Sequence, residues 1–168
     1  MLTFQQLRDV SAVFWDFDNT LCIWGPVTWT HEDAASYAAG GGYTDQLKAH
    51  MGVNPTIEEI VNDLAKHAVR QAVLSHVTFG HTLFTKQKWV QEKYPDAFTE
   101  FYGVNAPQNK VEFMKKWYEH NNKHGQIVLV DDLEDTCSTV RSDGFEAYTP
   151  MQLIQLYVNR AGAGREFQ

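Results

Sequence analysis

The sequence predicts an α/β fold, a Rossmann-like parallel sheet with helices on both faces. Four short apolar runs do not alternate with polar residues, which is typical of strands that are buried on both sides. They cover residues 12–15, 72–75, 127–130 and 145–148, and the segment 98–104 is a candidate for a fifth strand. Segments with helical spacing lie between these runs. Strands that alternate with helices along a chain usually form a parallel sheet.

Three segments carry helix signals, two of them between predicted strands and one after the last strand. The first, 55–71, begins at Pro55, has acidic residues in its first turn and basic residues near its end, as the helix dipole favours. The second, 109–125, has apolar residues at helical spacing and stops near a glycine. The third follows the last predicted strand, where Thr149 is the expected N-cap and a proline occupies the first helical position.

Residues 24–54 fit this alternation badly. The segment is irregular and contains a glycine triplet at 40–42. A loop of this length is usually functional or disordered. We therefore expect a core made of residues 1–23 and 55–160, a small cap or lid inserted after the first strand at 24–54, and a flexible tail at 161–168.

Composition and charge limit the classes of function. With 168 residues, 43% of them apolar, the chain is long enough for one domain with a substantial core. A formal net charge of −7 makes general nucleic-acid binding a poor expectation, although a local basic groove remains compatible with it. Only Cys22 and Cys137 are present, which indicates a reducing compartment. The first residues lack a secretion-signal pattern and no apolar run approaches a membrane span, so we expect a cytoplasmic protein without a membrane partner.

Acidic residues follow two of the predicted strands. Asp16 and Asp18 come directly after the first strand, and Asp131, Asp132 and Asp135 follow the strand 127–130. Because the carboxyl ends of parallel strands meet at one edge of a sheet, these like charges would lie close together. That arrangement is costly unless a cation neutralises it. Oxygen ligands of this kind suit Mg²⁺, which we expect as the cofactor.

A hydroxyl and an ammonium group are expected at the same edge. Ser75 ends the second predicted strand, with Thr78 as a competing candidate. Lys110 opens the helix that leads into the second acidic strand, with Lys86 and Lys88 as rivals. A hydroxyl and a lysine beside carboxylates and a magnesium ion can hold a phosphoryl group.

The order of these groups resembles the haloacid dehalogenase superfamily of phosphohydrolases, in a small-cap or capless form. The likeness consists of D-x-D-x-T (Asp16, Asp18 and Thr20), then a strand-terminal serine, then a lysine, then D-D-x-x-D after a strand. It spans residues 13–148 apart from the insertion. The D-x-D-x-T pattern alone is a weak signal, whereas all four parts in order are a specific one.

The resemblance implies a role for each catalytic candidate. Asp16 corresponds to the nucleophile that forms an aspartyl-phosphate, and Asp18 to the general acid that later acts as the base. Thr20 and Ser75 would orient Asp18 and the phosphate. Lys110 would stabilise the charge of Asp16 and of the phosphate.

The resemblance also implies a magnesium site. Asp131 and Asp135 match the D-x-x-x-D spacing of the family's metal ligands, and Asp132 could replace either of them. Magnesium would also contact Asp16 and the backbone carbonyl of Asp18.

The expected reaction is Mg²⁺-dependent hydrolysis of a phosphomonoester, because Asp18 supplies the proton donor that a phosphatase needs and a dehalogenase does not. Aromatic residues near the rim favour a nucleotide or other small phosphate ester, with Trp24, His76 and His81 as candidate contacts. Trp24, Trp29 and Tyr43 can equally form a small apolar core for the insertion. The alternatives are a phosphoprotein or nucleic-acid end as substrate, a phosphotransferase, and a binding or regulatory protein without turnover. The sequence leaves the oligomeric state open.

Overall fold

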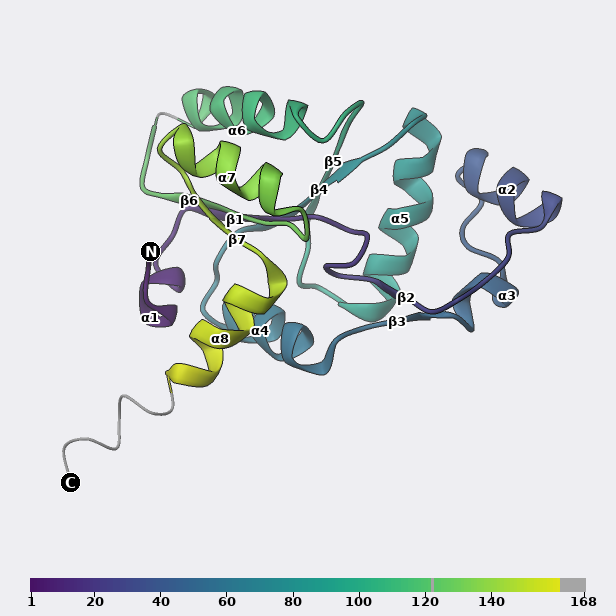
Figure 1. Cartoon of the computed structure of the whole chain (residues 1–168), viewed down its shortest axis with the longest axis horizontal. Helices are drawn as coiled ribbons and strands as arrows, with labels where there is room; N and C mark the ends of the chain where they lie inside the picture. Colours follow the sequence, from purple (N-terminus) through teal and green to yellow (C-terminus); the bar gives the residue numbers. More distant parts are fainter. Residues whose placement is uncertain (122, 161–168) are drawn as a thin grey trace.

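The structure is a computed structural model that describes residues 1–121 and 123–160, so the tail expected at 161–168 lies outside the described residues. Figure 1 shows a central sheet with helices on either side and a smaller group of elements at one end. The elements in chain order are α1 (Phe4–Leu7), β1 (Ala12–Trp15), β2 (Ile23–Trp24), α2 (His31–Ala38), α3 (Asp45–Lys48), β3 (Met51–Gly52), α4 (Pro55–Lys66), β4 (Gln71–His76), α5 (Gly80–Lys93), β5 (Glu100–Val104), α6 (Asn109–His120), β6 (Ile127–Val130), α7 (Glu134–Ser142), β7 (Glu146–Tyr148) and α8 (Pro150–Asn159).

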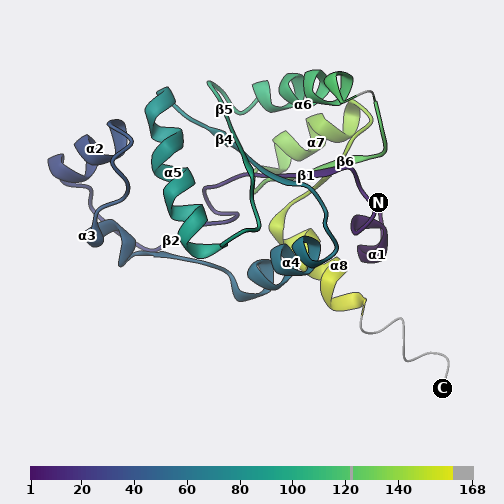
Figure 2. The ribbon, with the colours of Figure 1, turned by 180° about the vertical axis from the view of Figure 1, so that it is seen from behind.

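The main sheet is parallel throughout, with the strand order β5-β4-β1-β6-β7. Strand β1 lies at its centre, where Trp15 is opposite Val73 of β4 and Val130 of β6. Helices α6 and α7 cover one face, and α1, α4 and α8 cover the other (Figures 1 and 2). The predicted α/β fold with a Rossmann-like parallel sheet is therefore confirmed.

The two faces of the sheet carry two separate apolar cores, which explains why the strands do not alternate with polar residues. Val13 and Trp15 of β1 belong to the core shared with α4, α5 and α8. Ala12 and Phe14 point to the other side, where the Phe14 ring lies 5.1 Å from the ring of Trp117 on α6. Each fully buried large apolar side chain contributes about 1.5–3 kcal/mol to folding.

The predicted helix at 55–71 ends earlier than expected. It stops at Lys66, because Ala68 adopts a φ of 57°, in the left-handed region, and Gln71 already begins β4. The expected cap of the last helix is confirmed, since Thr149 forms a capping box with Gln152. No helix was predicted at α5 or α7.

The region between β1 and α4 forms a small unit of its own. Strands β2 and β3 pair antiparallel, and α2 and α3 lie between them in the chain. The buried carboxylate of Asp33 joins these helices, because it accepts hydrogen bonds from Thr30, Thr44 and Gln46. The Thr44 hydroxyl makes the largest contribution to holding the pKa of Asp33 below its usual range.

This unit is hydrogen-bonded to α5, and α2 lies beside α5 in Figure 1. The Thr85 hydroxyl donates to the Tyr37 carbonyl at 3.2 Å, and the Lys88 ammonium donates to the Gly40 carbonyl at 3.0 Å. Among the described residues, no helix has both the length and the apolar character needed to cross a membrane.

The loop that follows β1 is anchored by Tyr94, the C-cap residue that directly follows α5. Its phenol donates to the backbone carbonyl of Leu21 at 2.7 Å, and both residues are buried. Asn19 lies in the left-handed region with a φ of 57°, and the amide of Cys22 bonds back to the carbonyl of Phe17. A tight turn of this kind brings the D-x-D segment to the sheet edge and returns the chain toward β2.

We expect Tyr94→Phe to lower the free energy of unfolding by about 1–3 kcal/mol, because it leaves the buried Leu21 carbonyl without its donor. Denaturant unfolding measures this value. The matched control is Tyr118→Phe, which removes a phenol that bonds an exposed carbonyl, that of Lys123. Equal losses in the two variants would contradict the anchoring role of Tyr94.

Candidate active site

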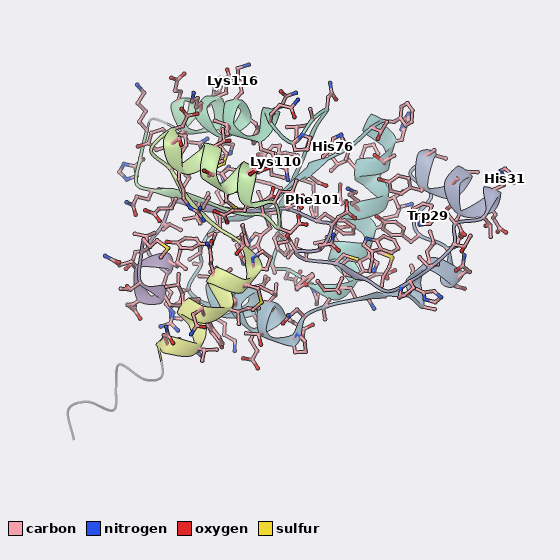
Figure 3. The ribbon with its side chains drawn as sticks, in the orientation of Figure 1. Trp29, His31, His76, Phe101, Lys110 and Lys116 are labelled. Carbon is pink, nitrogen blue, oxygen red and sulfur yellow. The ribbon has the colours of Figure 1, made fainter. Side chains whose placement is uncertain are left out.

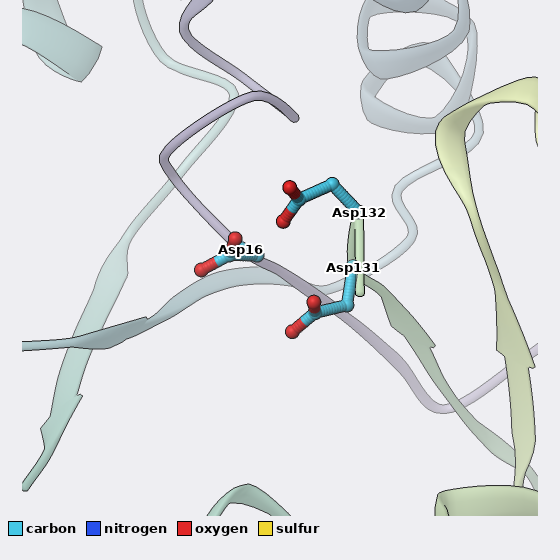
Figure 4. A group of neighbouring side chains, drawn as sticks. All are labelled: Asp16, Asp131 and Asp132. Atoms are coloured by element: carbon cyan, nitrogen blue, oxygen red, sulfur yellow. The ribbon is translucent and has the colours of Figure 1, made fainter. Parts of the chain in front are cut away.

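Two neighbouring strands place their first acidic residues side by side. Asp16 follows β1 and Asp131 follows β6, and the amide of Asp16 donates to the carbonyl of Val130 at 2.8 Å. Asp132 approaches from the next position of the same strand end, as Figure 4 shows. One carboxylate oxygen from each of the three aspartates lies within 4.8 Å of the others.

Lys110 lies between two of these carboxylates. Its ammonium donates to Oδ1 of Asp16 at 2.8 Å and to Oδ2 of Asp131 at 2.6 Å. Lys110 comes from the first turn of α6 and points into the protein, whereas Lys116 on the same helix points outward (Figure 3). The other oxygen of Asp131 accepts the amide of Leu133 at 2.9 Å. A buried charge is stable only with such partners.

The charges in this group are unevenly balanced. Burial raises the pKa of Asp16 to about 7, and Asp131 adds to the rise while Lys110 opposes it. Burial acts to lower the pKa of Lys110, but Asp16 and Asp131 raise it above its ordinary value, so the lysine is protonated. The pKa of Asp132 is also raised, first by burial and then by Asp131.

These residues fit a magnesium ion. Lys110 pairs with two of the three carboxylates, so an added divalent cation would reduce the repulsion that remains among the three. The donors are hard oxygens, and they converge from two strand ends, which is the chemistry that Mg²⁺ selects. Asp16, Asp131 and Asp132 are the side chains that could hold it.

Asp18 belongs to a second network beside the first. Its Oδ2 accepts from the Lys86 ammonium at 2.9 Å, and its Oδ1 accepts from the indole nitrogen of Trp24 at 2.9 Å. Lys86 also donates to the Ser75 hydroxyl at 2.8 Å and to the His76 carbonyl at 3.1 Å. This lysine therefore joins the end of β4 to the D-x-D segment.

From the sequence, Lys86 was expected only as an alternative to Lys110. In the structure Lys110 bonds to Asp16 and Asp131, whereas Lys86 bonds to Asp18 and Ser75. Lys86 lies on the buried side of α5 together with Thr82, Thr85 and Trp89. This spacing of three and four residues marks an inward helix face, and a lysine within it is unusual unless it is paired. A lysine at an inward-facing helix position is therefore the sequence signal that could have assigned Lys86 to the site.

The remaining candidates lie in different surroundings. Thr20 is fully buried, and its hydroxyl has no hydrogen-bond partner among the described residues. Asp135 is exposed in the first turn of α7 and is not part of the three-carboxylate group. His76 reaches the network through its carbonyl, while its side chain is exposed (Figure 3). His81 is exposed on α5, with its ring 6.5 Å from that of Phe84.

The aromatic residues of the insertion pack on one another. The ring of Trp24 lies 5.9 Å from Trp29 and 5.5 Å from Tyr43, and Tyr43 stacks on Tyr37 at 5.7 Å. Tyr43 also lies parallel to Phe17, with ring centres 6.1 Å apart. These contacts give the insertion an apolar core that continues to the residue between Asp16 and Asp18.

Comparisons with known proteins identify the fold. No protein-family model matches the sequence, and no curated protein matches it. Among solved structures, the N-terminal part of a Bacteroides fragilis protein containing a phosphatase domain, complexed with Mg, has 19% identity and a TM-score of 0.53 over 95% of this chain. This chain covers only 41% of the length of that solved N-terminal part.

Two further structures are similar over most of both chains. A putative phosphoglycolate phosphatase from Lactobacillus delbrueckii subsp. bulgaricus has 14% identity and a TM-score of 0.53, covering 88% of this chain and 86% of the other. A hydrolase from Streptococcus pneumoniae has 13% identity and a TM-score of 0.51, covering 89% and 98%. These likenesses, all at 19% identity or less, show that the chain shares the fold of solved phosphatases and hydrolases.

We expect Mg²⁺ to bind at the three-carboxylate group, with Asp132→Asn weakening its affinity by at least about tenfold. Loss of one negative charge a few ångströms from a cation costs more than about 1 kcal/mol. Asp132 is only half-buried, so the substitution leaves the core intact. Calorimetric titration with MgCl₂ measures the affinity.

The matched control is Asp135→Asn, which removes an exposed carboxylate outside the group. Its Mg²⁺ affinity should stay within about twofold of that of the wild type. A larger loss in Asp135→Asn than in Asp132→Asn would instead favour the D-x-x-x-D ligand set expected from the sequence.

Proposed function

We propose that the protein is a Mg²⁺-dependent phosphomonoester hydrolase that acts through an aspartyl-phosphate on Asp16. The observation that carries the proposal is the placement of Asp16, which is buried and bonded to Lys110, beside Asp131 and two residues before a half-exposed Asp18. The likeness of the fold to solved phosphatases supports it.

In the first step, Asp16 attacks the phosphorus atom of the substrate. Lys110 donates to Oδ1 of Asp16, which leaves Oδ2 as the attacking oxygen. The bond between phosphorus and the ester oxygen breaks as the new bond to Oδ2 forms. Asp18, protonated at the start of this step, gives its proton to the leaving oxygen, so an alcohol departs and Asp18 becomes a carboxylate.

In the second step, water attacks the phosphorus atom of the aspartyl-phosphate. Asp18 takes the proton of the water, the bond between phosphorus and Oδ2 of Asp16 breaks, and inorganic phosphate leaves. Both side chains return to their starting states.

Two lysines assist these steps from different sides. Lys110 stabilises the negative charge on Asp16, and Lys86 with the Ser75 hydroxyl supplies donors next to Asp18. Bound Mg²⁺, held by Asp16, Asp131 and Asp132 and in this proposal also by the Asp18 backbone carbonyl, would offset charge on the phosphoryl oxygens.

A small phosphate ester is the proposed substrate class. The insertion that adjoins α5 is short, and its aromatic rings pack on one another, with Trp29 the most exposed of them. Nucleoside monophosphates therefore belong in the substrate panel beside sugar and aryl phosphates.

The test is release of inorganic phosphate from 4-nitrophenyl phosphate and from that panel, with and without MgCl₂. We expect hydrolysis that depends on Mg²⁺ and that Asp16→Asn lowers by at least about 10³-fold, since it removes the nucleophile. Asp9→Asn, at an exposed aspartate preceding β1, is the matched control and should retain wild-type activity.

Other outcomes would favour another function. A folded protein that binds Mg²⁺ and releases no phosphate from any of these esters would contradict the proposal and favour a macromolecular substrate or a binding role. Phosphate that appears on an added alcohol instead of water would identify a phosphotransferase.

A further inference from the structure

The carboxylate of Asp18 is restrained at both oxygens by donors from two different elements. Trp24 of β2 donates its indole N–H to Oδ1, and Lys86 of α5 donates to Oδ2, each at 2.9 Å. The side chain of Asp18 is 48% exposed, so water could satisfy it without either partner. The bond from Trp24 therefore serves to fix the direction of the Asp18 side chain, whereas the bond from Lys86 also compensates the burial of the lysine charge.

The ring of Trp24 is itself held in place. It packs on Trp29 and on Tyr43, and Tyr43 stacks on Phe17, which lies between Asp16 and Asp18 in the chain. These contacts link Phe17, next to Asp18 in the chain, through Tyr43 to Trp24. Trp24 in turn bonds to the Asp18 side chain. A side chain whose donor is locked by packing keeps its geometry with little loss of entropy on reaction.

The insertion and α5 act as one support for Asp18. The insertion contributes Trp24, α5 contributes Lys86, and the two elements are joined by hydrogen bonds from Thr85 and Lys88 to insertion carbonyls. A displacement of the insertion from α5 would therefore separate the two donors that hold the carboxylate.

We propose that Trp24 is a positioning residue for Asp18, and that its indole N–H aims the carboxyl group at the leaving oxygen of the substrate. This inference rests on the proposed phosphatase function. It assigns to the insertion a part in proton transfer, in place of the direct substrate contact that the sequence suggested for Trp24. Misplacement of a reacting group by about 1 Å can cost about 10²-fold in rate.

Esters with different leaving groups can distinguish a positioning role of Trp24 from a role in folding or in substrate contact. An ester of a weakly acidic phenol needs a proton from Asp18 as its bond to phosphorus breaks, because the departing oxygen is strongly basic. An ester of a strongly acidic phenol departs as the anion and needs little help. A misdirected Asp18 therefore slows the first ester much more than the second.

The test compares kcat/KM for phenyl phosphate and 4-nitrophenyl phosphate in wild type and Trp24→Phe, both with Mg²⁺. The variant keeps an aromatic ring and loses the N–H donor. We expect kcat/KM for phenyl phosphate to fall by about 10–100-fold and that for 4-nitrophenyl phosphate by less than about threefold. The kcat/KM value reports the first step, whereas hydrolysis of the aspartyl-phosphate is common to both esters.

Two controls isolate the hydrogen bond. Trp29→Phe changes a neighbouring ring of the same aromatic cluster whose indole nitrogen makes no hydrogen bond within the described residues, so the ratio of the two kcat/KM values should stay at the wild-type level. In an Asp18→Asn background, Trp24→Phe should change that ratio by less than about twofold, since residues that act together are not additive.

The outcomes are distinct. Equal losses of kcat/KM for both esters, or a rise in KM alone, would overturn the inference and assign Trp24 to folding or to substrate contact. Unchanged kinetics would overturn it as well. If the wild type hydrolyses neither ester, the proposed function itself fails, whatever the variant does.

Discussion

The bonds from Lys110 to Asp16 and Asp131 are the contacts on which the site depends. Parallel pairing of β1 with β6 brings two acidic strand ends together, and burial makes their repulsion costly. The lysine offsets part of this cost, and it can do so only because α6 begins where its first turn overlies both strands. The fold thus gathers three carboxylates at this end of the sheet and places one buried lysine among them. Negative charge that the lysine does not neutralise is left for a bound metal cation to offset.

The site divides its charges between two lysines with separate partners. Lys110 donates hydrogen bonds to the buried carboxylates, whereas Lys86 donates to the half-exposed Asp18 and to the Ser75 hydroxyl. The two aspartates of the D-x-D segment consequently occupy different environments although one residue separates them. In the proposed mechanism Asp16 attacks as the ionised group while Asp18 gives a proton, so Lys110 must keep Asp16 ionised against the burial that raises its pKa to about 7.

The sequence predicted the sheet and the first acidic group, because both depend on local patterns. Uninterrupted apolar runs identify buried strands, and an acid after such a run must lie at the sheet edge. It did not predict α5, whose inward face carries Thr82, Thr85 and Lys86 in place of apolar residues. It expected Asp135 in the metal group, but α7 begins at Glu134 and leaves Asp135 exposed. The bond from Trp24 to Asp18 depends on how the insertion folds back, which no local pattern encodes.

The central position of β1 has a consequence for the order in which the protein opens. Its amides are flanked on both sides by strands, so hydrogen exchange there should require global unfolding. The insertion is closed by a ladder of two residue pairs between β2 and β3, and its amides should exchange through local opening at much lower free energy. We therefore expect the insertion, which carries Trp24, to open locally while the central sheet beside Asp16 stays folded.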